Sequence, residues 1–332
     1  MYTTAFITSF LFLGGYAKAR QLSRETTTTI KLEDTVVELN YANNNINKRV
    51  AAIFDVDGTL YRVPGDSTGA ATAVVTLFWI TRASSLIKFS MVVFCIPILL
   101  VVLYILDKID RTMSLFLMSN LQFVGVKTSI IQTCMDKFVS SNEFQAMINK
   151  TAVKRLNEHL ARGDLVVLIS ATPNLVTGPI AKFFQANIAC GSKCVIENDI
   201  VTRGQYQNTL LIGHAKEQLV SEILVKRYNI NLENSYAYGD HITDLPVLNM
   251  VGNPVAVNPT NKLEVVAIQK NWEILLEEKS TSTENPKKES SLLHELIFIA
   301  NNALFPSTTD TNDVSDDNKE RAEETTRGLS KL

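Results

Sequence analysis

Two short segments of the chain carry paired carboxylates next to a glycine. Residues 55–60 read DVDGTL, and residues 239–246 read GDHITDLP. Two carboxylates held close together repel each other unless a cation neutralises them, so the first segment predicts a metal site that the second would complete. Hard oxygen ligands beside a phosphate favour Mg2+. Asp55 could then attack phosphorus as a nucleophile, while Asp57 protonates the leaving oxygen and afterwards activates water.

Two further segments supply groups that a transferring phosphoryl group needs. Ser170 is followed by Ala171, and a hydroxyl with the amides after it can hold phosphate oxygens. Lys216 lies at an expected helix start, where its ammonium can neutralise both the nucleophile and the phosphoryl group. In the first segment, Gly58 lets the turn approach the phosphate closely, and Thr59 can bond back to the turn.

Apolar runs before these segments predict the strands that position them. Buried strands are expected at residues 49–54, 165–169 and 236–238, and each ends where a polar segment begins. Helical patterns lie between them, at residues 151–161 before Gly163, and at residues 179–186. Strands that alternate with helices predict a doubly wound, Rossmann-like α/β fold, with the polar segments at the carboxyl edge of a parallel sheet.

Length and composition restrict the class of protein further. The chain has 332 residues, enough for one large α/β domain with an insertion or for two modest ones. Its 32 basic and 34 acidic side chains give a formal net charge of −2 without a basic run, which disfavours nucleic acid as a partner. Four cysteines are few for this length, so a disulfide framework is not expected.

Composition also predicts how the chain is divided. The core domain is expected at residues 49–60 and 151–278, and an apolar, helical cap is expected between them at residues 61–150. Residues 1–48 are expected to be a targeting or leader segment and a linker. Residues 279–332 are expected to hold a polar linker, a short helix and a disordered acidic tail.

The apolar insertion limits how the chain could meet a membrane. Residues 89–106 carry no charge. An uncharged run of this length is marginal for a membrane span. Asp55 precedes this run, whereas Ser170, Lys216 and Asp240 follow it, so a single crossing would divide the site between two sides. Membrane-surface association through a re-entrant or monotopic segment is therefore the expectation, and a cap helix buried by its neighbours is the alternative.

In this order, the four polar segments resemble the motifs of the haloacid dehalogenase superfamily of phosphatases, over residues 50–276. The resemblance implies an aspartyl phosphate on Asp55, with Asp57 as the acid/base and as a metal ligand through its backbone carbonyl. Mg2+ is the implied cofactor. The other implied roles are phosphate binding by Ser170, Ala171 and Lys216, metal binding by Asp55 and Asp240, and support of the site by Thr59 and Asp244.

An insertion between the first two motifs is similar to the type-I helical cap of subfamily IB in this superfamily. The chain also looks like the phosphatase-like N-terminal domain of land-plant glycerol-3-phosphate acyltransferases. The likeness lies in the apolar cap, in the segment GVK at residues 125–127 and in the second motif, SATP, at residues 170–173. It implies a membrane-associated phosphomonoester hydrolase of lipid metabolism, acting on a lysophospholipid or glycerol phosphate.

Other interpretations of the same residues stay open. The substrate could be soluble, such as phosphoserine, and a phosphomutase would use the same acid, Asp57. A non-catalytic membrane protein could keep the fold for binding, although every expected polar residue is present. His159 and Asp164 match the spacing of a glycerolipid acyltransferase motif, but the end of a helix before a strand explains both residues.

Overall fold

The structure is a computed structural model that describes residues 31–40, 49–62, 80, 119–120, 122–203 and 210–277. All of them belong to one compact unit, Met1–Lys288, and the second unit, Glu289–Leu332, lies outside the described residues. The uncharged run at residues 89–106, the first thirty residues and the expected acidic tail also lie outside them. Within the described ranges, no helix is both long and apolar enough to cross a membrane.

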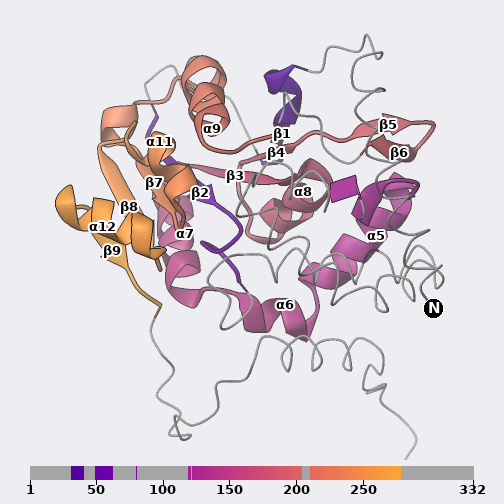
Figure 1. Cartoon of the computed structure of the whole chain (residues 1–332), viewed down its shortest axis with the longest axis horizontal. Helices are drawn as coiled ribbons and strands as arrows, with labels where there is room; N and C mark the ends of the chain where they lie inside the picture. Colours follow the sequence, from indigo (N-terminus) through magenta and orange to yellow (C-terminus); the bar gives the residue numbers. More distant parts are fainter. Residues whose placement is uncertain are drawn as a thin grey trace, which may run out of the picture. The chain divides into compact units, whose positions relative to one another are not determined.

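A seven-stranded sheet forms the centre of the described unit, in the order β1-β4-β3-β2-β7-β8-β9 (Figure 1). Every neighbouring pair runs parallel except β1 and β4, which are antiparallel. The predicted parallel α/β sheet is therefore confirmed. Its strands are β1 (Val36–Glu38), β2 (Ala51–Asp55), β3 (Leu165–Pro173), β4 (Ile188–Ser192), β7 (Tyr236–Gly239), β8 (Asn253–Val257) and β9 (Glu273–Leu275).

The central strand, β2, carries the first polar segment. Its first four residues are buried, as expected for an apolar run covered on both faces, and the strand ends at Asp55. Asp55 pairs in register with Ile169 of β3, one residue before Ser170. On the other side, β2 pairs with β7, which ends at Gly239, directly before Asp240. Three polar segments thus lie at or near the carboxyl ends of neighbouring parallel strands, at one edge of the sheet.

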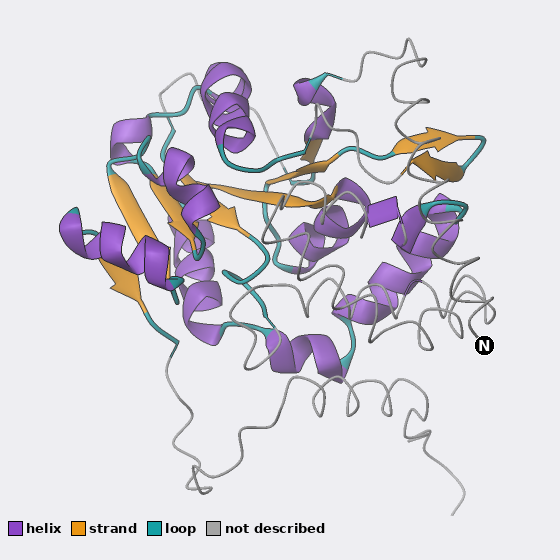
Figure 2. Ribbon diagram, in the orientation of Figure 1, coloured by secondary structure: helices purple, strands orange, loops and turns teal. Residues whose placement is uncertain are grey.

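Helices cover both faces of this sheet (Figure 2). On one face, Ala51 and Ile53 belong to a buried cluster with residues of a long helical run and of two short helices. These elements are α9 (His214–Gln218), η3 (Leu219–Leu224), α10 (Val225–Tyr228), α11 (Leu245–Leu248) and α12 (Asn261–Gln269). On the other face, Phe54 stacks on Tyr238 at 4.1 Å and meets the ring of His159, which belongs to α7 (Lys150–Arg162).

The bounds of two helices can be compared with those expected from the sequence. α7 ends as predicted, because Gly163 adopts φ 78° and its N–H bonds to carbonyls of the last turn. α8 (Asn174–Phe183) packs on β3 and β4, and it begins before the expected start at Pro179. Proline favours the first turn of a helix, and this preference placed the start too late; here Pro179 lies inside the helix.

The sheet also extends into the segment expected as a leader and linker. Residues 32–38 form η1 (Leu32–Thr35) and β1, and Val36 pairs with Cys190 of β4. The carboxylate of Glu38 accepts a hydrogen bond from the Tyr228 hydroxyl at 2.8 Å. The structure differs from the expectation here because three residues of strand are too short to give a pattern of their own.

The described part of the expected cap region is helical. α5 (Thr128–Val139) packs against α8, and α6 (Asn142–Met147) follows it. The ring of Phe144 in α6 is fully buried and contacts the ring of Tyr61 at 5.2 Å between centroids. Near this part of the chain, β5 (Val195–Glu197) and β6 (Ile200–Arg203) form a separate antiparallel hairpin that bonds to Gly125.

The chain returns from the insertion beside the point where it left. The N–H of Arg62 donates to the carbonyl of Met147, and the N–H of Asn149 donates to the carbonyl of Leu60, both at 2.9 Å. The buried side chain of Asn149 donates to the carbonyl of Thr59 at 3.1 Å and also caps α7. These bonds join residues 59–62 to residues 147–149, and we call this set of bonds the clasp.

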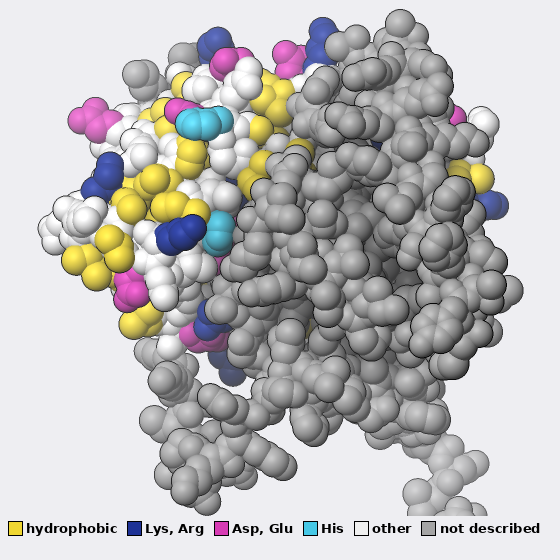
Figure 3. Space-filling view, in the orientation of Figure 1, with side chains coloured by type: hydrophobic (Ala, Val, Ile, Leu, Met, Phe, Trp, Pro, Cys, Tyr) yellow, Lys and Arg dark blue, Asp and Glu magenta, His cyan; other side chains and the backbone are white. Residues whose placement is uncertain are grey.

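Apolar side chains are also exposed at the far edge of the sheet. Figure 3 shows hydrophobic side chains on the surface over α12, where Val265 is 54% and Ile268 is 65% exposed.

Two short 3-10 helices complete the described elements, η4 (Leu232–Asn234) and η5 (Ile242–Asp244). Of these, η5 follows β7 and carries part of the site.

Candidate active site

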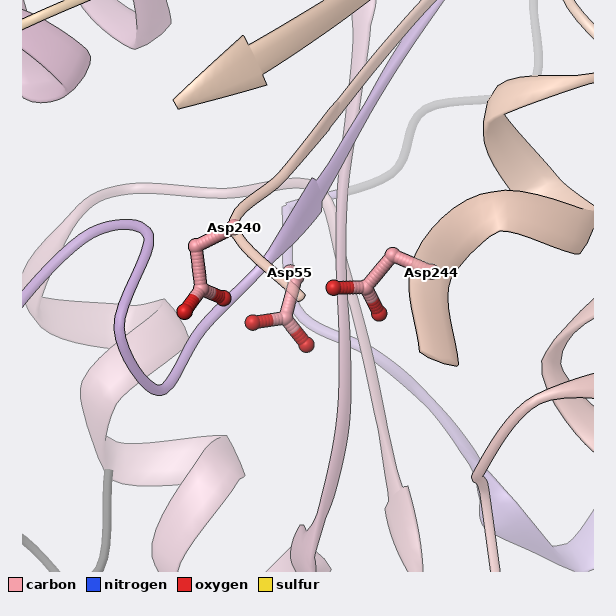
Figure 4. A group of neighbouring side chains, drawn as sticks. All are labelled: Asp55, Asp240 and Asp244. Carbon is pink, nitrogen blue, oxygen red and sulfur yellow. The ribbon is translucent and has the colours of Figure 1, made fainter. Parts of the chain in front are cut away.

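Three carboxylates meet at the carboxyl edge of the sheet (Figure 4). They belong to Asp55 at the end of β2, Asp240 directly after β7, and Asp244 at the end of η5. One oxygen of each carboxylate lies within 4.8 Å of an oxygen of the others. The metal set expected from the sequence was Asp55, Asp57 and Asp240; the structure adds the carboxylate of Asp244, which the sequence had placed in a supporting role.

Lys216 lies beside two of these carboxylates. Its ammonium bonds to Asp55 and donates to Asp244 Oδ1 at 2.7 Å, although its side chain is only 6% exposed. Burial alone lowers the pKa of Lys216, but the attraction of Asp244 and Asp55 outweighs burial, so its pKa is raised. Lys216 therefore stays charged, in the position that the sequence predicted for it.

The carboxylates carry more negative charge than one ammonium balances. Burial raises the pKa of Asp55 most, and the negative charge of Asp244 raises it further. Together they bring this pKa to about 7, although Lys216 acts to lower it. Burial, and next the charge of Asp55, raise the pKa of Asp240 well above its usual value. A group of buried oxygen ligands with unbalanced negative charge fits a hard divalent cation such as Mg2+.

The turn after β2 approaches the carboxylates closely. Thr59 Oγ1 lies 3.3 Å from both Asp55 Oδ2 and Asp240 Oδ1, and it can donate to either. Gly58 has φ 95°, and a Cβ atom at this position would lie 2.3 Å from Asp240 Oδ2. Only glycine combines this backbone conformation with space for the carboxylate.

We expect Gly58→Ala to weaken metal binding. The added methyl group would displace the Asp240 carboxylate and would strain the turn. Thermal unfolding measured over a Mg2+ titration should show a loss of metal affinity and a lower Tm. Gly178→Ala is the matched control, because nothing lies within 4 Å of that position inside α8, and alanine there should be neutral or stabilising by up to about 1 kcal/mol. Equal Mg2+ responses in both variants would contradict the expectation.

The side chain of Asp57 lies in a different environment from that of Asp55. Three hydroxyl groups donate to it: Ser170 Oγ at 2.6 Å and Thr172 Oγ1 at 2.7 Å to Oδ2, and the Tyr61 hydroxyl at 2.9 Å to Oδ1. The N–H of Thr172 donates in turn to Ser170 Oγ at 2.9 Å. The carbonyl of Ala171 accepts a hydrogen bond from Ser192 at 2.6 Å. Ser170 is thus placed beside the predicted acid/base, as part of a hydroxyl network.

Sequence reasoning missed Tyr61 and Thr172 as members of this site. Thr172 lies inside the second motif, two residues after Ser170, and only its hydroxyl contact with Asp57 distinguishes it. Tyr61 follows the first motif and reads as a continuation of its apolar end. Burial raises the pKa of the Tyr61 hydroxyl well above its usual value, and the charge of Asp57 raises it further, so the group is a hydrogen-bond donor at neutral pH.

His159 and Asp164 form a pair far along the strand from the carboxylates. Asp164 precedes the first residue of β3, whereas Ser170 lies near the carboxyl end of that strand. His159 Nδ1 lies 2.8 Å from Asp164, and Nε2 lies 2.7 Å from the Tyr238 hydroxyl. Desolvation of the buried ring lowers the pKa of His159. The pair therefore joins the end of α7 to the sheet, as the interpretation of a helix end expected.

Comparisons with known proteins agree with this geometry. A family model described as haloacid dehalogenase-like hydrolase matches residues 52–249, more than half of the chain. The chain is 34% identical over 116 residues to phosphoserine phosphatase SerB1 of Mycobacterium tuberculosis, which covers 35% of this chain and 37% of that relative. It is 30% identical over 122 residues to histidinol-phosphatase of Neisseria meningitidis, covering 36% of this chain and 55% of the relative.

A solved structure supports the fold. The crystal structure of a protein with unknown function from Bordetella pertussis superposes with a TM-score of 0.58 and 23% identity, over 69% of this chain and 99% of that one. The chain spans only about a third to a half of the length of the two curated relatives named above. Its family nevertheless follows from the match over residues 52–249. The chain belongs to the haloacid dehalogenase-like hydrolases.

Proposed function

We propose that this chain is a Mg2+-dependent phosphomonoester hydrolase that works through an aspartyl phosphate on Asp55. One observation carries the proposal. Asp55 and Asp57 are two residues apart, yet Asp55 lies with an ammonium and two carboxylates, whereas Asp57 accepts three hydroxyl hydrogen bonds. Two carboxylates in such different environments suit two different roles, a nucleophile and an acid/base.

The first half of the reaction forms the aspartyl phosphate. An oxygen of Asp55 attacks phosphorus, the bond from phosphorus to the ester oxygen breaks, and Asp57 gives a proton to the leaving alkoxide. Lys216 stays charged beside Asp55 and balances the negative charge that gathers on the phosphoryl oxygens. The hydroxyl of Ser170, near Asp57, is placed to turn towards one of those oxygens.

The second half returns the enzyme to its starting state. Asp57, now deprotonated, takes a proton from water, the water oxygen attacks phosphorus, and the bond to Asp55 breaks to release inorganic phosphate. The carboxylates of Asp55, Asp240 and Asp244 and the carbonyl of Asp57 are the groups that would hold Mg2+. When bound, Mg2+ supplies positive charge that neutralises the carboxylates and the phosphoryl oxygens.

The substrate class follows from two separate lines of support. The named relatives are a phosphoserine phosphatase and a histidinol-phosphatase, which favour the phosphate ester of a small alcohol. The uncharged run at residues 89–106 and the likeness to the phosphatase-like domain of land-plant glycerol-3-phosphate acyltransferases favour glycerol phosphate or a lysophospholipid at a membrane surface. An alkyl phosphomonoester is common to both lines.

A phosphate-release screen tests this function. Phosphoserine, glycerol phosphate and lysophosphatidate are offered to the full-length chain with Mg2+ and with EDTA. We expect release from at least one ester with Mg2+ and none with EDTA, because the carboxylates need a cation to accept an anionic substrate. Turnover of lysophosphatidate with flotation of the chain on lipid vesicles would support the membrane substrate. No release from any ester, or release that persists in EDTA, would contradict the proposal.

A further inference from the structure

The hydroxyl of Tyr61 is buried against the predicted acid/base. Tyr61 is 0% exposed, and its hydroxyl donates to Asp57 Oδ1 at 2.9 Å. A buried tyrosine hydroxyl needs a hydrogen-bond partner, but a backbone carbonyl would satisfy it as well as a carboxylate. The use of Asp57 as the partner links this tyrosine directly to the reacting groups.

The hydroxyl donors are divided unevenly over the Asp57 carboxylate. Ser170 and Thr172 both donate to Oδ2, at 2.6 and 2.7 Å, and Tyr61 donates to Oδ1. An ionised carboxylate has about four lone-pair sites, two on each oxygen. Three are therefore occupied while Ser170 faces Asp57, and the one left belongs to Oδ1; Tyr61 remains the donor to Oδ1 when Ser170 turns to the phosphate. Tyr61 thus determines the direction in which this remaining site of Asp57 points.

Tyr61 is itself held rigidly by its surroundings. Its carbonyl accepts a hydrogen bond from the N–H of Gly58 at 2.9 Å, and its backbone forms a bridge with Ile148. Its ring lies against the ring of Phe144 in α6. The clasp therefore fixes this side chain from both ends of the insertion, and the position of the hydroxyl is set before any substrate binds.

We propose that Tyr61 is a positioning residue for leaving-group protonation, because it aims the remaining site on Oδ1 of Asp57 at the leaving oxygen. This inference rests on the proposed function, in which Asp57 transfers that proton. Tyr61 touches neither the metal-binding carboxylates nor, in this role, the substrate. It acts only through Asp57, and the ring and the hydroxyl have separate tasks: the ring fills space, and the hydroxyl orients the carboxylate.

The two tasks can be separated by the leaving group of the substrate. A poor leaving group, such as the alkoxide of an alkyl phosphate, needs its proton during bond cleavage, whereas p-nitrophenolate leaves readily without one. A tyrosine that only fills the core would affect both substrates equally when its hydroxyl is lost. A tyrosine that positions the acid would affect the alkyl ester much more strongly.

The experiment compares Tyr61→Phe with the wild type. The substrates are p-nitrophenyl phosphate and the alkyl phosphate, among phosphoserine, glycerol phosphate and lysophosphatidate, that the wild type hydrolyses fastest. We expect kcat/KM, which reports the half of the reaction in which the leaving group departs, to fall about ten- to a hundredfold for the alkyl ester and less than about threefold for p-nitrophenyl phosphate. kcat alone does not separate the two tasks, because Asp57 also activates water in the second half of the reaction, which both substrates share.

Tyr228→Phe is the matched control. It removes another buried tyrosine hydroxyl, which bonds to Glu38 at 2.8 Å on a part of the sheet that carries no carboxylate of the site. This variant should leave the ratio of the two kcat/KM values unchanged. A second test places Tyr61→Phe in an Asp57→Asn background, where the loss of the tyrosine hydroxyl should add less than about a twofold further decrease.

Each outcome decides between the inference and the proposed function. Equal losses for both substrates, or a full further loss in the Asp57→Asn background, would overturn the role of Tyr61 and leave the phosphatase in place. A wild type without phosphate release, or an Asp55→Asn variant that keeps it, would overturn the proposed function and the role of Tyr61 with it. A selective loss for the alkyl ester, absent in Tyr228→Phe, supports the inference.

Discussion

Asp55→Asn should abolish phosphate release, with a decrease in kcat of about 10⁴-fold or more, because the loss of a catalytic nucleophile removes nearly all the rate. An amide oxygen attacks phosphorus poorly, so the aspartyl phosphate does not form. The variant should still fold, since asparagine keeps the shape of the side chain. It also removes one of three negative charges that now repel each other.

Phosphate release under saturating Mg2+ measures this effect, and circular dichroism verifies the fold. Asp136→Asn is the matched control: Asp136 lies on the exposed face of α5, where it accepts a hydrogen bond from Gln132 at 2.9 Å. The control should keep the wild-type rate. Wild-type turnover by Asp55→Asn would mean that another group attacks the phosphorus, and the proposed mechanism would be wrong.

Among the substitutions proposed, Lys216→Met should lower the free energy of unfolding most when Mg2+ is absent. The ammonium bonds to two buried carboxylates, Asp55 and Asp244, and methionine would leave both without it. Breaking a buried ion pair from one side costs about 3–5 kcal/mol of unfolding free energy. The rate should also fall by about 10²–10³-fold, because a fixed positive charge beside the phosphoryl group is lost.

Urea unfolding with and without Mg2+ measures the stability change. Mg2+ should restore more stability to Lys216→Met than to the wild type, since a bound divalent cation can replace the missing charge. Lys270→Met is the control, because Lys270 is exposed and, among the described residues, donates to Asn249 at 2.8 Å and lies over the Trp272 ring. If both lysine variants lost the same stability, the ion-pair argument would fail.

Three strands of the seven-stranded sheet could be predicted, because each begins as a short apolar run before a polar segment, whereas β4, β8 and β9 were not predicted. β2 and β7 appear where expected, and β3 continues beyond the expected strand to Pro173. β1 could not be predicted in this way. It has three residues and pairs within the described sheet with β4, far along the chain, so no local pattern marks it.

The positions of the site residues could be predicted where they depend on the order of the strands in the chain and on where each strand ends. Asp55, Ser170 and Asp240 lie at or near the carboxyl ends of strands in one parallel sheet, and such a sheet brings these ends together. The contacts of Tyr61 and Thr172 could not be predicted, because the direction of a hydroxyl depends on packing between distant segments. Asp244 illustrates the same limit: a short turn, η5, brings its carboxylate to Lys216.

The clasp has a consequence for how such a protein can change during evolution. Hydrogen bonds between residues 59–62 and 147–149 close the insertion at its base, immediately beside Asp57. Segments between the two sides of the clasp can lengthen, shorten or be exchanged, as long as the ends stay paired and Phe144 still packs on Tyr61. The insertion can therefore vary without disturbing Asp57, and chimaeras should be joined at the clasp.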